Sequence, residues 1–304
     1  MQNYNNNAYE LLVSDLINDA FYLDERSRRG TIATIRQYTE VIIRRILDLP
    51  HGDSVTIGNK KIISKIKQKS NNNKFLLSSL ETIRDIGNKC THTKEINEIT
   101  STDVKTVIES LFNLLSYLLI DYFERHEFGC NSEIVTSFSI LPPIIRYITL
   151  NYLHCQYPTN ILIIDKLALA ILKAFNKVEA EKWINEKKDF LETLPTVTEE
   201  AKQGVIDKYG IEFAELLVST APPNMYVLCV ERIEKVNSII EQKGRLYFDF
   251  ESAVEIYRKE GKVAGDTIDI VEFNSIMEFL YLGRRARNNE LLKAKDSYLI
   301  IDNL

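Results

Sequence analysis

Apolar residues recur along the chain at three- and four-residue spacing, and stretches that alternate apolar and polar residues are nearly absent. This spacing predicts amphipathic helices, because it places the apolar side chains on one helix face. In the first part of the chain the pattern predicts helices over 9–22, 31–49, 62–66, 75–90 and 101–125. The last of these follows the cap-forming run Thr100-Ser-Thr-Asp103. We therefore predict an all-α fold that begins with a four- or five-helix bundle.

The same helical pattern continues after a short break rich in Gly, Asn, Ser and Pro between 129 and 143. Such composition is typical of a linker, so we predict a helical bundle over 1–128 and a second, mainly helical domain over 129–304. Helices of the second domain are predicted over 145–153, 165–191, 223–244, 251–259 and 270–282. One more helix is predicted to begin at the capping box Thr196-x-x-Glu199.

Composition and the N-terminus bear on the compartment. The longest apolar run, 107–123, is interrupted by Glu109, Asn113 and Asp121, so we predict no membrane span. The first residues lack the basic start and apolar stretch of a secretion signal, which indicates a cytoplasmic protein without a membrane partner. The four cysteines are widely separated and form no C-x-x-C pair, so neither a disulfide framework nor a structural zinc site is expected.

One basic segment stands out in a chain whose net charge of −5 excludes a general polyanion binder. No acid occurs between Asp53 and Glu81, whereas six lysines do. Such a run can neutralise nucleic-acid phosphates, and the alternative is a solvated surface segment. The predicted RNA-binding residues in this segment are Lys60, Lys61, Lys65, Lys67 and Lys69.

The candidate chemistry lies in the predicted helix over 75–90 and directly after it. Arg84, Asn88 and His92 follow one another at four-residue spacing, which lines them up on one helix face. Arginine holds phosphate oxygens in a fork, histidine exchanges protons near neutral pH, and an amide orients a hydroxyl or phosphate oxygen. Together these three side chains could bind and cleave a phosphodiester without a metal ion. The alternative is that they form a polar network that stabilises the bundle.

Gly87 lies between these residues, where glycine costs a helix about 1 kcal/mol relative to alanine. Close approach of another helix, from the same chain or a second copy, would explain its small size. A helix that ends at Gly87 is the competing interpretation. His51, His126 and His154 have no partners at ligand spacing, so we predict that they are solvated and that the chain binds no metal.

The pattern Arg84-x-x-Gly87-Asn88-x-x-x-His92 resembles the motif of the HEPN superfamily, whose helical bundles carry an arginine, a polar residue and a histidine. Arg36-x-x-x-Glu40 resembles an arginine-and-glutamate helix that precedes this motif in one uncharacterised bacterial branch. The resemblance covers about residues 8–125. In nucleases of the family an arginine directly precedes the polar residue, where this chain has Gly87.

The resemblance implies a homodimer in which two copies of the motif share one cleft and cut RNA without a metal ion. It implies that His92 is the general acid or base, that Arg84 stabilises the charge on phosphorus, and that Asn88 orients the reacting groups. Arg36 and Glu40 are predicted to support this site, and a structural salt bridge between them is an equal alternative.

Our leading hypothesis is an RNA-cleaving effector of a bacterial toxin or antiphage system that needs no cofactor. Residues 129–304 would sense a trigger or bind a partner protein. A non-catalytic module that binds nucleotide, RNA or a protein is the second hypothesis, and a structural oligomerisation module is the third. Phosphate-cradling loops of the G-x-x-x-x-G-K-[ST] type and nucleophile elbows are missing from the sequence, which argues against an ATPase and an esterase.

Overall fold

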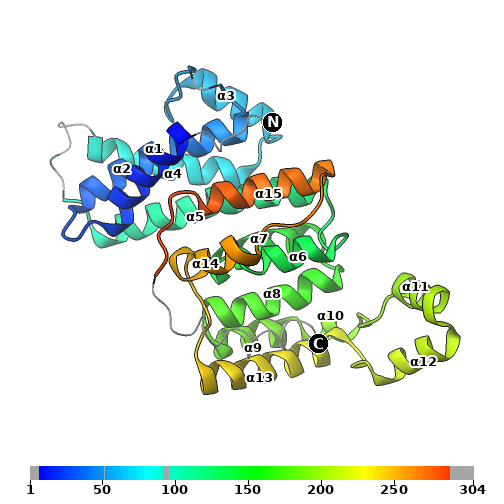
Figure 1. Ribbon diagram of the computed structural model, residues 1–304. Helices are drawn as coiled ribbons and strands as arrows, with labels where there is room; N and C mark the ends of the chain where they lie inside the picture. Colours follow the sequence, from blue (N-terminus) through cyan, green and yellow to red (C-terminus); the bar gives the residue numbers. More distant parts are fainter. Residues whose placement is uncertain (1–6, 51, 92–95, 97, 288–304) are drawn as a thin grey trace. The chain divides into compact units, whose positions relative to one another are not determined.

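The structure of the chain is a computed structural model that describes residues 7–50, 52–91, 96 and 98–287. These residues form fifteen α-helices and one π-helix, η1, and contain no strand (Figure 1). The prediction of an all-α fold is confirmed. The chain divides into two compact units: of the described residues, unit 1 contains those within 1–141 and 253–287, and unit 2 contains 142–252.

Unit 1 is built around three long helices that pack on one another. Its first elements are α1 (Asn7–Ile17), η1 (Asn18–Tyr22), α2 (Arg28–Leu47), α3 (Lys60–Lys69), α4 (Lys74–Thr91) and α5 (Ser101–Arg125). α2, α4 and α5 contact one another, α1 and η1 pack on α2, and α3 also packs on α2. Tyr38, Leu76 and Leu111 are among the side chains that form the core. The helices predicted from apolar spacing therefore lie where the pattern places them.

Helix α5 is long and apolar enough to cross a membrane by composition alone, but 67% of its most apolar stretch is buried inside the protein. Thr100 and Asp103 cap its first turn reciprocally, since each side chain accepts a hydrogen bond from the backbone N–H of the other. A helix with this much burial is the central core helix of a bundle.

Two later segments complete unit 1. They contain α6 (Ser132–Phe138), the larger part of α14 (Phe250–Glu260) and α15 (Ile268–Tyr281), which lies beside α5 in Figure 1. The Ser137 hydroxyl donates a hydrogen bond to the Gly261 carbonyl, and the Tyr281 hydroxyl donates one to the Ile140 carbonyl at 3.0 Å. This division differs from the predicted boundary between 128 and 129, because contacts between residues more than 100 positions apart bring 253–287 back to the bundle.

Unit 2 is a second helical assembly around α8. Its packed helices are α7 (Pro143–Gln156), α8 (Ile161–Ala174), α9 (Lys177–Glu186), α10 (Lys188–Glu192) and α13 (Met225–Lys243). The single helix predicted over 165–191 is wrong, since the structure divides it into α8, α9 and α10. The physical reason for the first break is Asn176, whose side chain caps α9 by accepting from the Glu179 N–H.

The remaining helices of unit 2, α11 (Glu199–Tyr209) and α12 (Ile211–Thr220), form a hairpin. Gly210 separates them with a φ of +89°, a conformation that favours glycine. The predicted capping box Thr196-x-x-Glu199 is wrong, because Thr198 caps α11 by accepting from the Ala201 N–H. The Thr196 hydroxyl instead donates to the Pro222 carbonyl at 2.6 Å.

Candidate functional site

The candidate site begins where α2 crosses α4 at Gly87. Gly87 is buried, and a Cβ atom added to it would lie 2.7 Å from Cδ of Arg36 and 3.3 Å from its Cγ. α4 continues past Gly87 to Thr91, so the alternative that the helix ends at Gly87 is wrong. The prediction that another helix approaches here is confirmed, and that helix is α2 of the same chain.

Alanine at position 87 should lower the free energy of unfolding of unit 1 by about 1 kcal/mol. Its better helix propensity stabilises by about 1 kcal/mol, whereas the clash with the Arg36 side chain costs about 1–3 kcal/mol. Denaturant unfolding of Gly87→Ala, Arg36→Ala and the double variant separates the gain in helix propensity from the cost of the clash with Arg36. Once Arg36 is truncated, Gly87→Ala should stabilise the protein; destabilisation in both backgrounds would show that Arg36 is not the obstacle.

Arg36 uses little of its hydrogen-bonding capacity. Its Nη1 lies 3.8 Å from Oε1 of Glu40, and its buried Nε has no hydrogen-bond partner among the described residues. Oε1 of Glu40 also accepts from the Ile57 N–H at 3.3 Å. Burial raises the pKa of Glu40, and the Ile57 N–H and the charges of Arg36 and Arg44 only partly offset this. The predicted ion pair is present but long, and it leaves the buried Nε of Arg36 without a partner among the described residues.

Arg84 has a different environment, because two neighbouring carboxylates hold its guanidinium. Its Nε donates to Asp85 at 2.8 Å and its Nη2 to Glu81 at 2.9 Å. Hydrogen bonds first to Asp85 and then to Glu81 raise the pKa of Arg84. The side chain is thus engaged with acids beside it and one turn before it, and the negative charges of these acids oppose the approach of a phosphate.

Asn88 lies one turn beyond Arg84 on α4 and is half-buried. No hydrogen bond between the two side chains is present. His92, the third predicted residue, follows the last residue of α4 and lies outside the described residues. Of the predicted residues, the structure therefore places Arg36 against Gly87, the residue next to Asn88 in the chain, and shows no hydrogen bond between Arg36 and Asn88.

Two further arginines of α2 contact the chain after Asn88. Arg29 donates a hydrogen bond to the Lys89 carbonyl in the last turn of α4, and Arg28 donates to the Ile99 carbonyl, just before α5, at 3.2 Å. The helix dipole favours a cation such as Arg29 at the C-terminal end of α4. Sequence reasoning missed both residues, although the seven-residue spacing between Arg29 and Arg36 places them on one face of α2 and could have revealed the first of them.

The predicted lysine segment forms the amphipathic helix α3. Ile62 and Ile66 are buried on its inner side, while Lys60, Lys61, Lys65, Lys67 and Lys69 are all exposed. Among the described residues, no carboxylate forms an ion pair with any of the five lysines. The Ile57 N–H bound by Glu40 lies three residues before α3, so Glu40 links the Arg36 side chain to the start of the basic helix.

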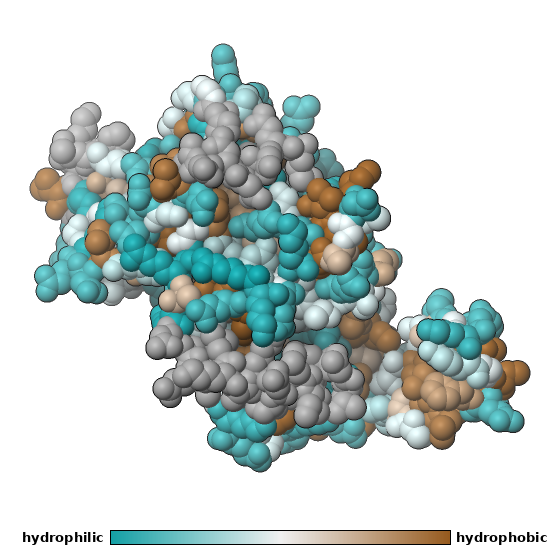
Figure 2. Space-filling view, viewed as in Figure 1, coloured by the Kyte–Doolittle hydropathy of each residue, from teal (hydrophilic) through white to brown (hydrophobic). Residues whose placement is uncertain are grey.

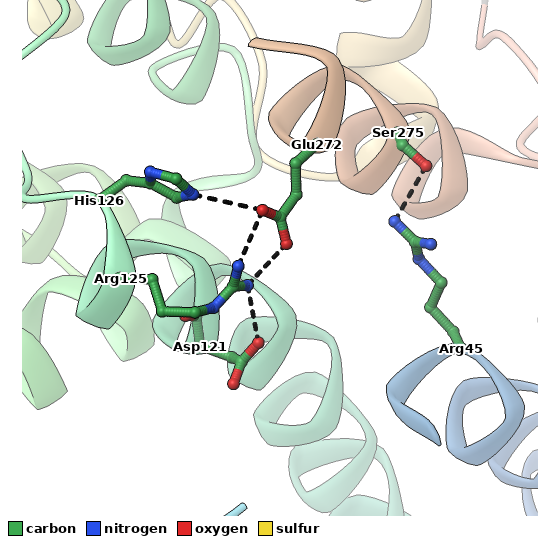
Figure 3. A network of polar contacts seen from close by, with 6 residues as sticks. All are labelled: Arg45, Asp121, Arg125, His126, Glu272 and Ser275. Atoms are coloured by element: carbon green, nitrogen blue, oxygen red, sulfur yellow. Dashed lines mark hydrogen bonds and ion pairs between the residues drawn. The ribbon is translucent and has the colours of Figure 1, made fainter. Parts of the chain in front are cut away.

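A second polar site in unit 1 lies between α2, α5 and α15 (Figure 3). Arg125 donates to both carboxylate oxygens of Glu272, at 2.8 and 2.6 Å, and to Asp121 at 2.9 Å. Nε2 of His126 lies 3.3 Å from Glu272, and Arg45 donates to the Ser275 hydroxyl at 2.9 Å. This network borders a cavity of about 190 Å³ lined by Arg45, Ile46, Asp48, Lys69, Tyr117, Leu118, Asp121, Arg125, Glu272 and Ile276.

The network connects α15 to α5. Burial by itself raises the pKa of Glu272, but the hydrogen bonds and charge of Arg125, helped by His126, outweigh burial and leave the pKa below its ordinary value. Both carboxylate oxygens of Glu272 are engaged, which is typical of a structural ion pair.

The prediction that the histidines are solvated is wrong for His154 and holds only in part for His126, whose side chain is 31% exposed. His126 contacts Glu272 and packs against Tyr122, with tilted rings whose centroids are 4.6 Å apart. His154 is buried against the edge of Trp183, and burial first, then the charge of Lys187, lowers its pKa. No local spacing could predict the first contact, because its partner is 146 positions away. His51 lies outside the described residues.

Within the part of the chain that the structure describes, no three His, Cys, Asp or Glu residues lie close enough together to hold a metal ion. No family model, no curated protein and no solved structure matches this chain. The likeness to the HEPN superfamily therefore depends on the motif residues themselves and stays a prediction.

Proposed function

We propose that this chain is a metal-independent RNA endonuclease, a cytoplasmic effector of a bacterial toxin or antiphage defence system that acts as a homodimer through the bundle of unit 1. The observation that carries the proposal is the packing of Arg36 on Gly87. It holds an arginine with an unused buried Nε beside the helix that bears Asn88 and leads to His92. A buried polar group without a partner needs an explanation, and a role beside a bound anion is one that suits an arginine.

In this mechanism the ribose 2′-oxygen attacks the adjacent phosphorus and the bond from phosphorus to the 5′-oxygen breaks. The products are a 2′,3′-cyclic phosphate and a 5′-hydroxyl. His92 removes the 2′-proton or protonates the leaving oxygen. Arg36, and Arg84 once it releases its carboxylates, stabilise the charge that develops on the phosphorane. Asn88 orients the attacking hydroxyl or a phosphate oxygen.

The decisive experiment is incubation of the purified full chain with total and transfer RNA in EDTA, followed by mapping of the product ends. Cleavage that leaves cyclic phosphates and disappears in His92→Ala would support the proposal. Cleavage that needs a divalent cation would contradict it, as would wild-type and His92→Ala protein of equal activity.

The lysines of α3 are proposed to bind the RNA backbone. Lys60→Gln combined with Lys61→Gln should weaken RNA binding several-fold. The slope of the logarithm of the binding constant against the logarithm of salt concentration should fall by about one for each phosphate contact that is lost. Filter binding or fluorescence anisotropy over a salt series measures both. Lys262→Gln is the matched control, because this exposed lysine of unit 1 is paired with Glu278 at 3.2 Å. Equal effects of the two changes would indicate general electrostatics instead of a binding helix.

A second candidate function is a non-catalytic module that binds nucleotide, RNA or a protein through the same bundle. The double engagement of Arg84 by Glu81 and Asp85 favours it, since a catalytic arginine must be available to the phosphate. RNA binding without cleavage by the wild-type chain, unchanged in His92→Ala, would support this module over the nuclease.

A further inference from the structure

The α11–α12 hairpin of unit 2 exposes an unusual amount of apolar surface. α12 buries only Ala214, and α11 contains no buried residue. Figure 2 shows apolar side chains gathered on this hairpin. Its exposed large apolar residues are Tyr209, Ile211, Phe213, Leu216, Leu217 and Val218, each between 37% and 61% exposed. Scattered single apolar residues are normal on a surface, but a cluster of this kind marks an interaction site.

The distribution of residues around α12 supports this view. Glu212, Glu215 and Ser219 follow one another at three- and four-residue spacing and form one narrow polar strip. The other sides of the helix are mainly apolar. A helix that is apolar on most sides is normally buried on most sides. Of the described helices, α11 provides the main contact with α12, so no other described helix covers most of this surface.

The hairpin is anchored where its two ends meet. The Thr196 hydroxyl donates to the Pro222 carbonyl at 2.6 Å, and the Met225 N–H donates to the Leu194 carbonyl at 2.9 Å. These bonds tie the segment before α11 to the segment after α12. The hairpin therefore projects from a closed base, as expected of a docking element.

We propose that a second copy of this chain covers this face, with the two hairpins packing α12 against α12 as a symmetric four-helix bundle. Helices of ten or eleven residues are marginal in water without tertiary packing, and a two-fold arrangement places the same apolar face on both sides of the contact. The polar strips of Glu212 and Glu215 then point to solvent.

The available area agrees with this arrangement. Tyr209 and Phe213 each expose about half of the 150–250 Å² of an aromatic side chain, and with the four aliphatic side chains the exposed apolar area is about 400–500 Å² for each hairpin. Two hairpins would bury at most about 1,000 Å², which is the size of a weak, reversible interface. The hairpin contains five acids and two lysines, and this acidic excess disfavours an anionic membrane surface as the occupant.

Light scattering of the full chain after size exclusion tests the proposal. Leu216→Glu should halve the mass and weaken self-association at least about tenfold, because it places a charge in the apolar contact. Val178→Glu is the matched control, since Val178 is 68% exposed on α9 of the same unit, and it should leave the mass unchanged. If unit 1 also dimerises, loss of the hairpin contact reduces the wild-type assembly to a dimer held through unit 1, so a lower mass remains the readout.

Three outcomes would overturn the proposal: a monomeric wild type, a Leu216→Glu protein of wild-type mass, or binding of the monomer to anionic vesicles through the hairpin. Hydrogen exchange of the wild type needs no substitution and so avoids the question of misfolding. Protection of α11 and α12 should rise with protein concentration, while protection of α8 should not. Protection of the hairpin that is independent of concentration would also contradict a second copy at this face.

Discussion

His92→Ala should abolish RNA cleavage by the purified chain while RNA affinity stays close to that of the wild type. A positioned acid or base contributes about 10²- to 10⁴-fold to a rate, and the described histidines, His126 and His154, contact Glu272 and Trp183 instead of the candidate site. Affinity depends mainly on phosphate contacts, which the lysines of α3 and the arginines of α2 would supply. Single-turnover cleavage in EDTA and anisotropy binding with the same RNA measure the two quantities separately.

The matched control for this variant is His126→Gln, which changes another histidine of unit 1 that is bonded to Glu272 and not to the candidate site. It should cleave RNA at nearly the wild-type rate as long as the fold is retained. If His126→Gln loses activity as fully as His92→Ala, loss of stability would explain both. If His92→Ala keeps its activity but loses RNA binding, the histidine holds the substrate instead of moving a proton.

The helical framework was predictable because it depends on local patterns. The cap of α5 at Thr100 and Asp103 and the amphipathic spacing of α3 can both be read from neighbouring residues. The close approach at Gly87 was also predictable, since a glycine inside a helix has a cost that something must explain. The unit boundary was not, because the bonds that return 253–287 to unit 1 join residues more than 100 positions apart.

The candidate site was predictable to a similar degree. The ion pair between Arg36 and Glu40 follows from four-residue spacing, and the carboxylates that hold Arg84 lie three residues before it and one after it. Both contacts are therefore between residues close in the sequence. The sequence could not show that Arg36 makes fewer hydrogen bonds than Arg84, because this depends on the packing between α2 and α4.

Glu272→Ala should lower the free energy of unfolding of unit 1 by about 2–3 kcal/mol at neutral pH. Breaking a buried ion pair costs about 3–5 kcal/mol, and the value here is smaller because the Arg125 side chain is 45% exposed. The loss arises because Arg125 keeps only Asp121 as a carboxylate partner among the described residues and His126 loses its contact. Denaturant unfolding at pH 7 measures it.

The pH dependence distinguishes a charge effect from a packing effect. The pKa of Glu272 is lowered in the folded state, so its stabilising contribution is complete above the pKa of the unfolded chain and is lost as pH falls through the lower, folded pKa. The difference between wild type and Glu272→Ala should therefore be constant near neutral pH and shrink below about pH 4. A difference that stays the same in acid would mean that packing of the side chain, and not its charge, stabilises α15.

Glu278→Ala is the matched control on the same helix, because Glu278 pairs with Lys262, whose side chain is 72% exposed. A surface pair of this kind contributes at most about 1 kcal/mol. If the two variants lose the same stability, the Arg125 network is no stronger than a surface salt bridge, and α15 must be held to α5 mainly by its apolar side chains. If Glu272→Ala loses clearly more, the ion pair is a main reason why this distant segment folds back onto the bundle that contains the candidate site.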